Sequence, residues 1–150
     1  MRYDHTQTAP LYLLLLAIGS AMLATAVMND ESPVARGILA GAGGLLLVTG
    51  ASFRQLTLRD EGDQLLVSFG PLPLFRRHVR YSDIQSVERA RTTLLDGWGI
   101  HYSVRGGWVW NLWGFECVTI HFHNGKKLHL GTDDSHALAA FLSQQATPAE

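Results

Sequence analysis

Two long apolar runs, separated by a short polar segment, occupy the first third of the chain. Twenty consecutive uncharged residues run from 9 to 28, and seventeen more run from 37 to 53. A helix of about twenty residues rises about 30 Å, which matches the hydrocarbon core of a bilayer. The pattern predicts a two-span transmembrane hairpin over residues 9–53, with a polar loop at 29–36 and a short tail at 1–8.

Small residues recur at three- or four-residue spacing in both apolar runs, as they do where membrane helices pack closely. They are Gly37, Gly41 and Gly44 in the second run, and Ala17 with Ala21 and Ser20 with Ala24 in the first. These residues are expected to join the two helices. The alternative is that glycine and alanine are simply common in membrane helices.

Beyond residue 53, apolar and polar positions alternate over short stretches, which is typical of β-strands. Leu56 and Leu58 precede an acidic turn at residues 60–63, after which apolar residues alternate again. Further along, Ile120 and Leu128 flank a second turn, and a three-residue turn would place both side chains on one face of the sheet. The sequence therefore predicts two hairpins in this region.

A single C-terminal helix is predicted, because Leu138, Phe141 and Leu142 have the spacing of one helix face. Together with the strands before it, this helix gives an α+β domain over residues 54–145. Residues 146–150 are expected to be a loose tail.

The distribution of Lys and Arg around the apolar runs predicts the orientation of the hairpin. Arg2, Arg54 and Arg59 flank its terminal side, and only Arg36 lies on its loop side. By the positive-inside rule, the domain lies in the cytoplasm, and the chain is a multi-pass protein of the inner membrane. The alternative is a cleaved signal peptide, since residues 24–26 resemble a cleavage site.

The composition of residues 54–150 excludes several classes of function. Ten basic and ten acidic side chains balance each other, which argues against a nucleic-acid partner. The single Cys117 excludes an internal disulfide and a cysteine-based metal motif. Nucleophile-elbow, phosphate-loop and metalloprotease motifs do not occur in the sequence. The sequence therefore predicts neither an enzyme nor a cofactor.

Three short motifs resemble the bacterial pleckstrin-homology-like (PH-like) domain family of small membrane proteins of unknown function. They are Gly97-Trp98-Gly99-Ile100, the strand Cys117-Val118-Thr119-Ile120 leading to Asn124-Gly125, and Gly131-Thr132-Asp133-Asp134. The resemblance implies an antiparallel β barrel or sandwich of about seven strands, capped by one C-terminal α-helix and tethered to membrane helices. The chain departs from the family at His101, where Arg is frequent, and at Ser135, where Pro is usual.

A basic stretch at residues 76–80 is the first candidate binding site for a lipid or a protein partner. Arg76, His78 and Arg80 would share one face of a strand, beside Arg77. Each cation near a membrane contributes about 1 kcal/mol of attraction to anionic head groups. The alternative is an edge strand kept soluble by charge. The acidic first turn at residues 60–63 argues against the phosphoinositide site of related eukaryotic domains.

Trp108 and Trp110 are the second candidate for a lipid or partner interface. Alternate residues of a strand project from one face, and exposed tryptophans suit a membrane or protein contact. The alternative is that the tryptophans fill the domain core, at least Trp98 and Trp113.

Three histidines of the last predicted hairpin are a candidate metal site. His121, His123 and His129 would fall on one face, but a structural zinc site needs four ligands and the strand pattern supplies no fourth. Solvent-facing or interface histidines are the other interpretation.

Taken together, the sequence predicts a membrane-anchored binding module that docks a protein partner or self-associates at the membrane surface. The alternatives are a sensor of anionic lipid surfaces and an accessory subunit that acts through its transmembrane hairpin.

Overall fold

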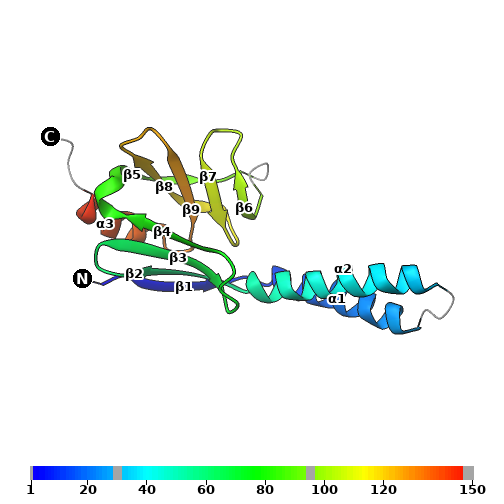
Figure 1. The fold of residues 1–150 in the computed structure, drawn as a ribbon. Coiled ribbons are helices and arrows are strands. Elements are labelled where there is room, and N and C mark those ends of the chain that lie inside the picture. Colours follow the sequence, from blue (N-terminus) through cyan, green and yellow to red (C-terminus); the bar gives the residue numbers. More distant parts are fainter. Residues whose placement is uncertain (1, 29–31, 94–96, 147–150) are drawn as a thin grey trace. The chain divides into compact units, whose positions relative to one another are not determined.

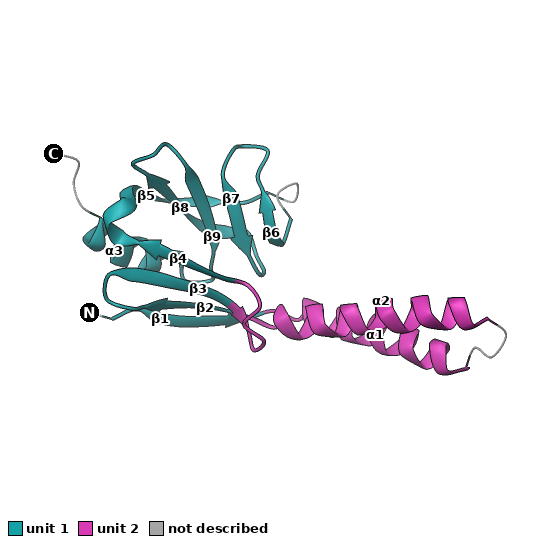
Figure 2. Ribbon diagram, viewed as in Figure 1, with its two compact units in different colours: residues 1–8, 56–68, 76–150 teal, residues 9–55, 69–75 magenta. Residues whose placement is uncertain are grey.

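The computed structural model describes residues 2–28, 32–93 and 97–146. These residues form two compact units, which Figure 2 colours separately. Unit 1 comprises residues 1–8, 56–68 and 76–150, and unit 2 comprises residues 9–55 and 69–75. The tip of the predicted hairpin loop, at 29–31, and the end of the predicted tail, at 147–150, lie outside the described residues.

Unit 2 contains the two apolar helices, α1 (Leu11–Met28) and α2 (Pro33–Ser52), side by side in Figure 1. Both are long and apolar enough to cross a membrane, with mean hydropathies of 2.2 and 1.6. The second helix begins four residues before the predicted start, because Pro33 suits the first turn and the Ser32 side chain accepts a hydrogen bond from the Ala35 amide.

The contact between α1 and α2 uses different glycines from those predicted. A Cβ atom at Gly43 would lie 2.8 Å from the carbonyl oxygen of Gly19, so the two backbones touch there. By contrast, Gly37, Gly41 and Gly44 face open space. The predicted small-residue faces of both helices point outward, and the prediction of which residues join the helices was wrong. The exposed residues of the predicted α1 face are Ala17, Ser20, Ala21 and Ala24.

The first sheet has the strand order β1-β2-β3-β4, and β3 and β4 are antiparallel. Its strands are β1 (Asp4–Thr8), β2 (Gln55–Asp60), β3 (Gln64–Gly70) and β4 (Arg76–Arg80). The predicted hairpin across residues 60–63 is confirmed, and Leu56, Leu58, Leu65 and Val67 are buried in the core. β1 was not expected from the sequence, because residues 1–8 were predicted to be a tail. It pairs with β2 although the two apolar helices separate them in the chain.

The second sheet has the order β5-β8-β9-β7-β6. Its strands are β5 (Ile84–Arg91), β6 (Gly99–Tyr102), β7 (Trp108–Asn111), β8 (Glu116–Phe122) and β9 (Lys127–Gly131). Ile120 faces Leu128, and the Phe122 amide bonds the Lys126 carbonyl, so the predicted three-residue turn is confirmed. β9 lies between β8 and β7 and runs parallel to β7, which places the start of β7 beside the start of β9.

The last helix, α3 (Ser135–Gln145), buries Leu138, Phe141 and Leu142 as predicted. Phe141 stacks on Tyr3 with a ring-centroid distance of 5.5 Å and meets Tyr81, in the 3-10 turn η1 (Tyr81–Asp83), edge-on at 5.9 Å. The fold is α+β, with two sheets and a C-terminal helix. The described residues form nine strands where about seven were expected, and the two sheets do not close into a barrel. The expectation of an entirely antiparallel arrangement was also wrong, because β7 and β9 are parallel.

A buried tyrosine links the first sheet to η1 and makes stability sensitive to acid. The Tyr81 hydroxyl donates a 2.7 Å hydrogen bond to Asp60 Oδ1, and the Gly62 amide donates another at 2.8 Å. The bond from Tyr81, followed by that from Gly62, lowers the pKa of Asp60 below its ordinary value. The folded state therefore favours the Asp60 carboxylate, which adds to the free energy of unfolding. This added stability is present above the unfolded-state pKa of about 3.9 and is lost as the pH falls through the lower folded-state pKa.

We therefore expect Asp60→Asn and Tyr81→Phe to flatten the acid limb of the stability profile. The measurement is urea unfolding from about pH 7 to about pH 3, followed by fluorescence, because all four tryptophans belong to unit 1. Asp63→Asn, which removes a nearby acid from the same turn, is the control. An unchanged acid limb in Asp60→Asn would contradict the prediction.

Candidate functional site

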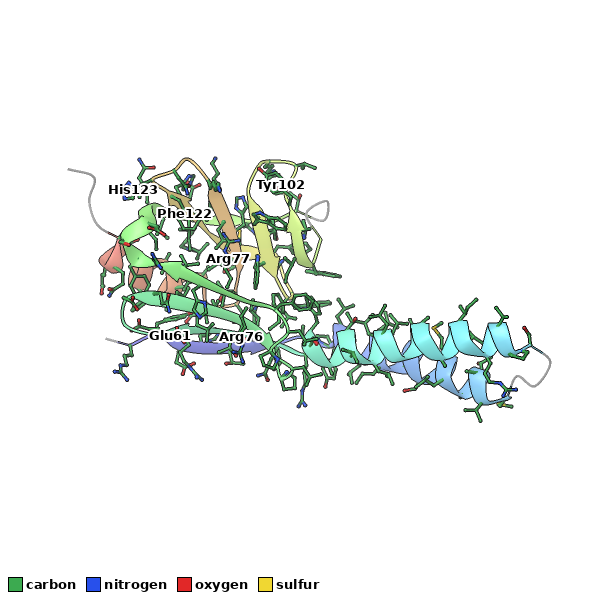
Figure 3. The ribbon with its side chains drawn as sticks, in the orientation of Figure 1. Glu61, Arg76, Arg77, Tyr102, Phe122 and His123 are labelled. Atoms are coloured by element: carbon green, nitrogen blue, oxygen red, sulfur yellow. The ribbon has the colours of Figure 1, made fainter. Side chains whose placement is uncertain are left out.

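Unit 1 contains a pocket of about 310 Å³ beside β4, the β6–β7 turn and the β8–β9 turn. The side chains that line it include four cations, two aromatic rings and no carboxylate. These are Arg77, Arg105, Lys126, Lys127, Tyr102 and Trp108. Arg77 and Tyr102 are labelled in Figure 3. We call this site the basic pocket.

Strand alternation brings Arg77 into the pocket. Its Cα pairs with that of Val67, whose side chain is fully buried, so Arg77 projects from the core face of β4. Arg76 projects from the opposite face (Figure 3). Burial lowers the pKa of the Arg77 guanidinium, although an arginine stays protonated at neutral pH. The pocket therefore holds one partly desolvated cation at its inner side.

A tight turn between β6 and β7 carries Arg105. Gly106 and Gly107 have φ angles of 83° and 99°, which residues with a side chain rarely adopt. The Gly106 amide donates to the Ser103 carbonyl, and the Ser103 amide donates to the Gly107 carbonyl. The Ser103 hydroxyl also accepts a bond from the Arg105 amide. These bonds fix the backbone from which Arg105 reaches the pocket.

Gly107 also allows the two turns to approach each other. A Cβ atom at Gly107 would lie 2.8 Å from both Cβ and the carbonyl oxygen of Lys127. The parallel pairing of Trp108 with Leu128 continues from this contact, and His129 Nε2 lies 3.0 Å from the Gly106 carbonyl oxygen. Backbone contact between the turns therefore places Arg105 and Lys127 around one opening.

The four cations of the pocket form no ion pair with the residues that the structure describes. Among the residues that the structure describes, no carboxylate lies within ion-pair distance of Arg77, Arg105, Lys126 or Lys127. Four like charges around one opening repel one another unless an anion enters. Arginine and lysine together bind carboxylate or phosphate oxygens well, because arginine supplies paired donors and lysine a compact charge.

Two aromatic rings form the apolar side of the pocket. Tyr102 and Trp108 pair across β6 and β7 and meet edge-on, with ring centroids 5.9 Å apart. They are 64% and 45% exposed, so both rings keep free surface for a ligand. The arrangement suits an anionic group attached to an apolar or planar portion.

The comparisons with known proteins give no family for this chain. No protein-family model matches the sequence, and no curated protein matches it either.

The structure separates the predicted basic stretch into two faces. Arg76, His78 and Arg80 share the exposed face of β4, as the alternation predicted, and His78 Nε2 lies 3.6 Å from Glu61 Oε2. Only Arg77 from this stretch lines the basic pocket. The row that was expected to bind head groups and the residue in the pocket therefore belong to different surfaces.

The predicted tryptophan pair is also divided. Trp108 lines the pocket, but Trp110 is only 8% exposed and belongs to the core. Trp98 and Trp113, which the alternative interpretation placed in the core, are instead partly exposed and stack with centroids 4.5 Å apart. An exposed surface for Trp110 was therefore a wrong expectation.

The side chains of two of the three histidines, His121 and His129, make separate contacts with protein groups. His121 Nε2 lies 2.9 Å from Glu88 Oε1, and His129 Nδ1 lies 2.9 Å from the Thr119 hydroxyl. His123 lies in the exposed turn after β8 (Figure 3). Within the described ranges, no group of three or more His, Cys, Asp or Glu side chains is placed to hold a metal ion.

Sequence reasoning missed Tyr102, Arg105, Lys126 and Lys127. A signal was present, because Arg105 precedes Gly106-Gly107 and the two lysines follow Gly125, so cations border both glycine turns. Glycine turns between strands indicate exposed loop tips, where binding residues often lie. The sequence pattern did not predict the parallel pairing of β7 with β9, which brings these two turns together.

Proposed function

We propose that the chain is a membrane-anchored binding module whose basic pocket binds an anionic group of a partner protein. In this proposal α1 and α2 cross the inner membrane, and unit 1, a PH-like domain, works on its cytoplasmic side. The observation that carries the proposal is the set of four cations with no ion-pair partner in the described structure, gathered around one opening.

A peptide partner is favoured over a free small anion by the strand beside the pocket. β4 is an edge strand, hydrogen-bonded to β3 on one side only, and it carries Arg77. An extended segment of a partner can add to such an edge through its backbone, while its acidic side chains reach nearby cations. The exposed ring faces of Tyr102 and Trp108 would then contact apolar parts of the same segment.

Arg77→Gln and Arg105→Gln are each expected to weaken binding of an acidic peptide at least tenfold. A charged hydrogen bond contributes about 1.5–3 kcal/mol, and about 1.4 kcal/mol corresponds to a factor of ten. The full-length protein would be placed in nanodiscs of neutral phosphatidylcholine and titrated with a dye-labelled oligoglutamate, with anisotropy as the signal. Arg76→Gln, on the opposite face of the same strand, is the matched control and should bind as the unchanged protein does.

Three other outcomes would count against the proposal. Equal affinities for Arg76→Gln and Arg77→Gln would mean that the peptide binds through general charge and not through the pocket. If none of the three substitutions changed the affinity for the peptide, the basic pocket would not be its binding site. In a second set of nanodiscs that contain anionic lipid, a loss of peptide binding that depends on Arg77 would favour the lipid-sensor alternative over a protein partner.

A further inference from the structure

An uncharged loop belongs to unit 2 together with the two apolar helices (Figure 2). It covers residues 71–75, between β3 and β4, and its sequence is Pro-Leu-Pro-Leu-Phe. The last two residues of β3, Phe69 and Gly70, belong to the same part of unit 2. Its large apolar side chains are unusually exposed: Leu72 at 44%, Leu74 at 60% and Phe75 at 40%. Such a group of exposed apolar residues marks a surface that contacts something other than water.

Aromatic contacts hold this loop against the end of α2. Phe53, the residue after α2, has its ring centroid 4.7 Å from that of Phe69 and 5.4 Å from that of Phe75. The Phe69 amide donates a hydrogen bond to the Phe75 carbonyl, which closes the loop at its base. The loop is therefore fixed at the end of the hairpin where α1 begins and α2 finishes.

The same end of the hairpin has the residues of a membrane–water boundary. The Arg54 guanidinium lies over the Tyr12 ring, 5.7 Å from its centroid. Tyrosine at helix ends and arginine extending toward the head groups are typical of that boundary. Thus the loop lies beside residues whose chemistry fits the surface of the bilayer.

The loop also has fewer backbone amide donors than most loops of its length, which suits an apolar environment. Pro71 and Pro73 have no amide hydrogen to satisfy, and the Leu74 amide donates to the Leu72 carbonyl at 2.8 Å. Few backbone donors are then left without a partner when water is removed, which is the main obstacle to placing a loop at a membrane.

We propose that residues 71–75 insert into the interfacial layer of the bilayer, as a third point of membrane contact beside α1 and α2. This inference rests on the proposed membrane anchoring. Leu72, Leu74 and Phe75 would enter the boundary between head groups and acyl chains, on the side of the membrane that holds both ends of the hairpin. The partner of this surface is thus the lipid bilayer.

The test uses spin labels on the full-length chain in phosphatidylcholine nanodiscs. Single cysteines would replace Leu74, Val104 in the β6–β7 turn, or Leu45 in α2; all three are at least 60% exposed, and the native Cys117 is buried. Collisions with oxygen, which concentrates in lipid, and with a water-soluble nickel chelate would be measured at each site. We expect the label at 74 to have an oxygen-to-nickel ratio between that at 45 and that at 104, and several-fold above the latter.

The reference positions separate the failure of this inference from that of the membrane anchor. If the label at 74 matches that at 104 while the label at 45 is shielded from nickel, the anchor stands and the loop inference is overturned. If the label at 45 is itself open to nickel, the anchor fails. A label at 74 shielded from both probes would show that protein covers the loop, which also overturns the inference.

Discussion

Gly43→Leu is expected to separate α1 from α2, whereas Gly41→Leu is expected to leave the hairpin intact. At Gly43 any side chain would meet the Gly19 carbonyl oxygen, with Leu23 and Met22 beside it, so the helices must move apart. Backbone cannot give way as a flexible side chain can, and overpacking of this kind costs about 1–3 kcal/mol. Gly41 faces open space, so a leucine there meets nothing in the protein.

The two variants form a matched pair, because each exchanges glycine for leucine within the same helix. The gain in helix propensity of about 0.8–1 kcal/mol is common to both and cancels in the comparison. Spin labels at Leu13 and Val48, exposed residues at the end of the hairpin where α1 begins and α2 finishes, report the separation of the helices by dipolar spectroscopy in nanodiscs. A longer, broader distance distribution should appear in Gly43→Leu only; the same change in Gly41→Leu would contradict the observed contact.

Hydropathy could predict the two apolar helices, but not which of their faces meet. Length and uniform apolarity are enough for a helix to be recognised as a possible span. The uniformity itself removes the polar face that would orient a helix in a soluble protein. The actual contact alternates large and small residues, with Leu15, Gly19 and Leu23 of α1 against Gly43 and Gly50 of α2. A search for small residues alone therefore selected the wrong faces.

The strands were predictable where neighbours in sequence are neighbours in the sheet. The β2–β3 and β8–β9 hairpins follow from alternation and turn residues. For β8–β9, the odd number of loop residues also predicts the register of the two strands. Pairings between distant segments leave no such local pattern. The parallel contact of β7 with β9 builds the basic pocket, and its residues Arg105 and Lys127 were missed for that reason.

The strand β1 is the clearest case of structure that sequence reasoning could not find. It is five residues long, carries no large apolar residue, and precedes the two apolar helices, so it was predicted to be part of a tail. Its most buried link to the rest of unit 1 is Gln7, which is 5% exposed. The Gln7 amide nitrogen donates to the Gly131 carbonyl at 3.2 Å, and its oxygen accepts from the Asp133 amide at 3.0 Å.

Gln7→Ala is therefore expected to destabilise unit 1 by about 2–4 kcal/mol, because two backbone groups lose their partner and each unsatisfied buried group costs about 1–3 kcal/mol. Gln7→Glu should be at least as damaging, since a carboxylate cannot donate to Gly131 and would lie near the acidic Asp133. Thr8→Ala, at an exposed residue of the same strand, is the control and should change stability by less than about 0.5 kcal/mol.

The measurement is urea unfolding of the full-length chain in detergent micelles, followed by tryptophan fluorescence, which reports only on unit 1. Equal stability of Gln7→Ala and Thr8→Ala would mean that the two side-chain hydrogen bonds of Gln7 do not stabilise unit 1, and would contradict the prediction. If Gln7→Glu loses more stability than Gln7→Ala, and the difference diminishes as the glutamate is protonated at low pH, the added negative charge is the cause of the difference. Such a result would make the segment before the first apolar helix an integral part of the domain that follows the second.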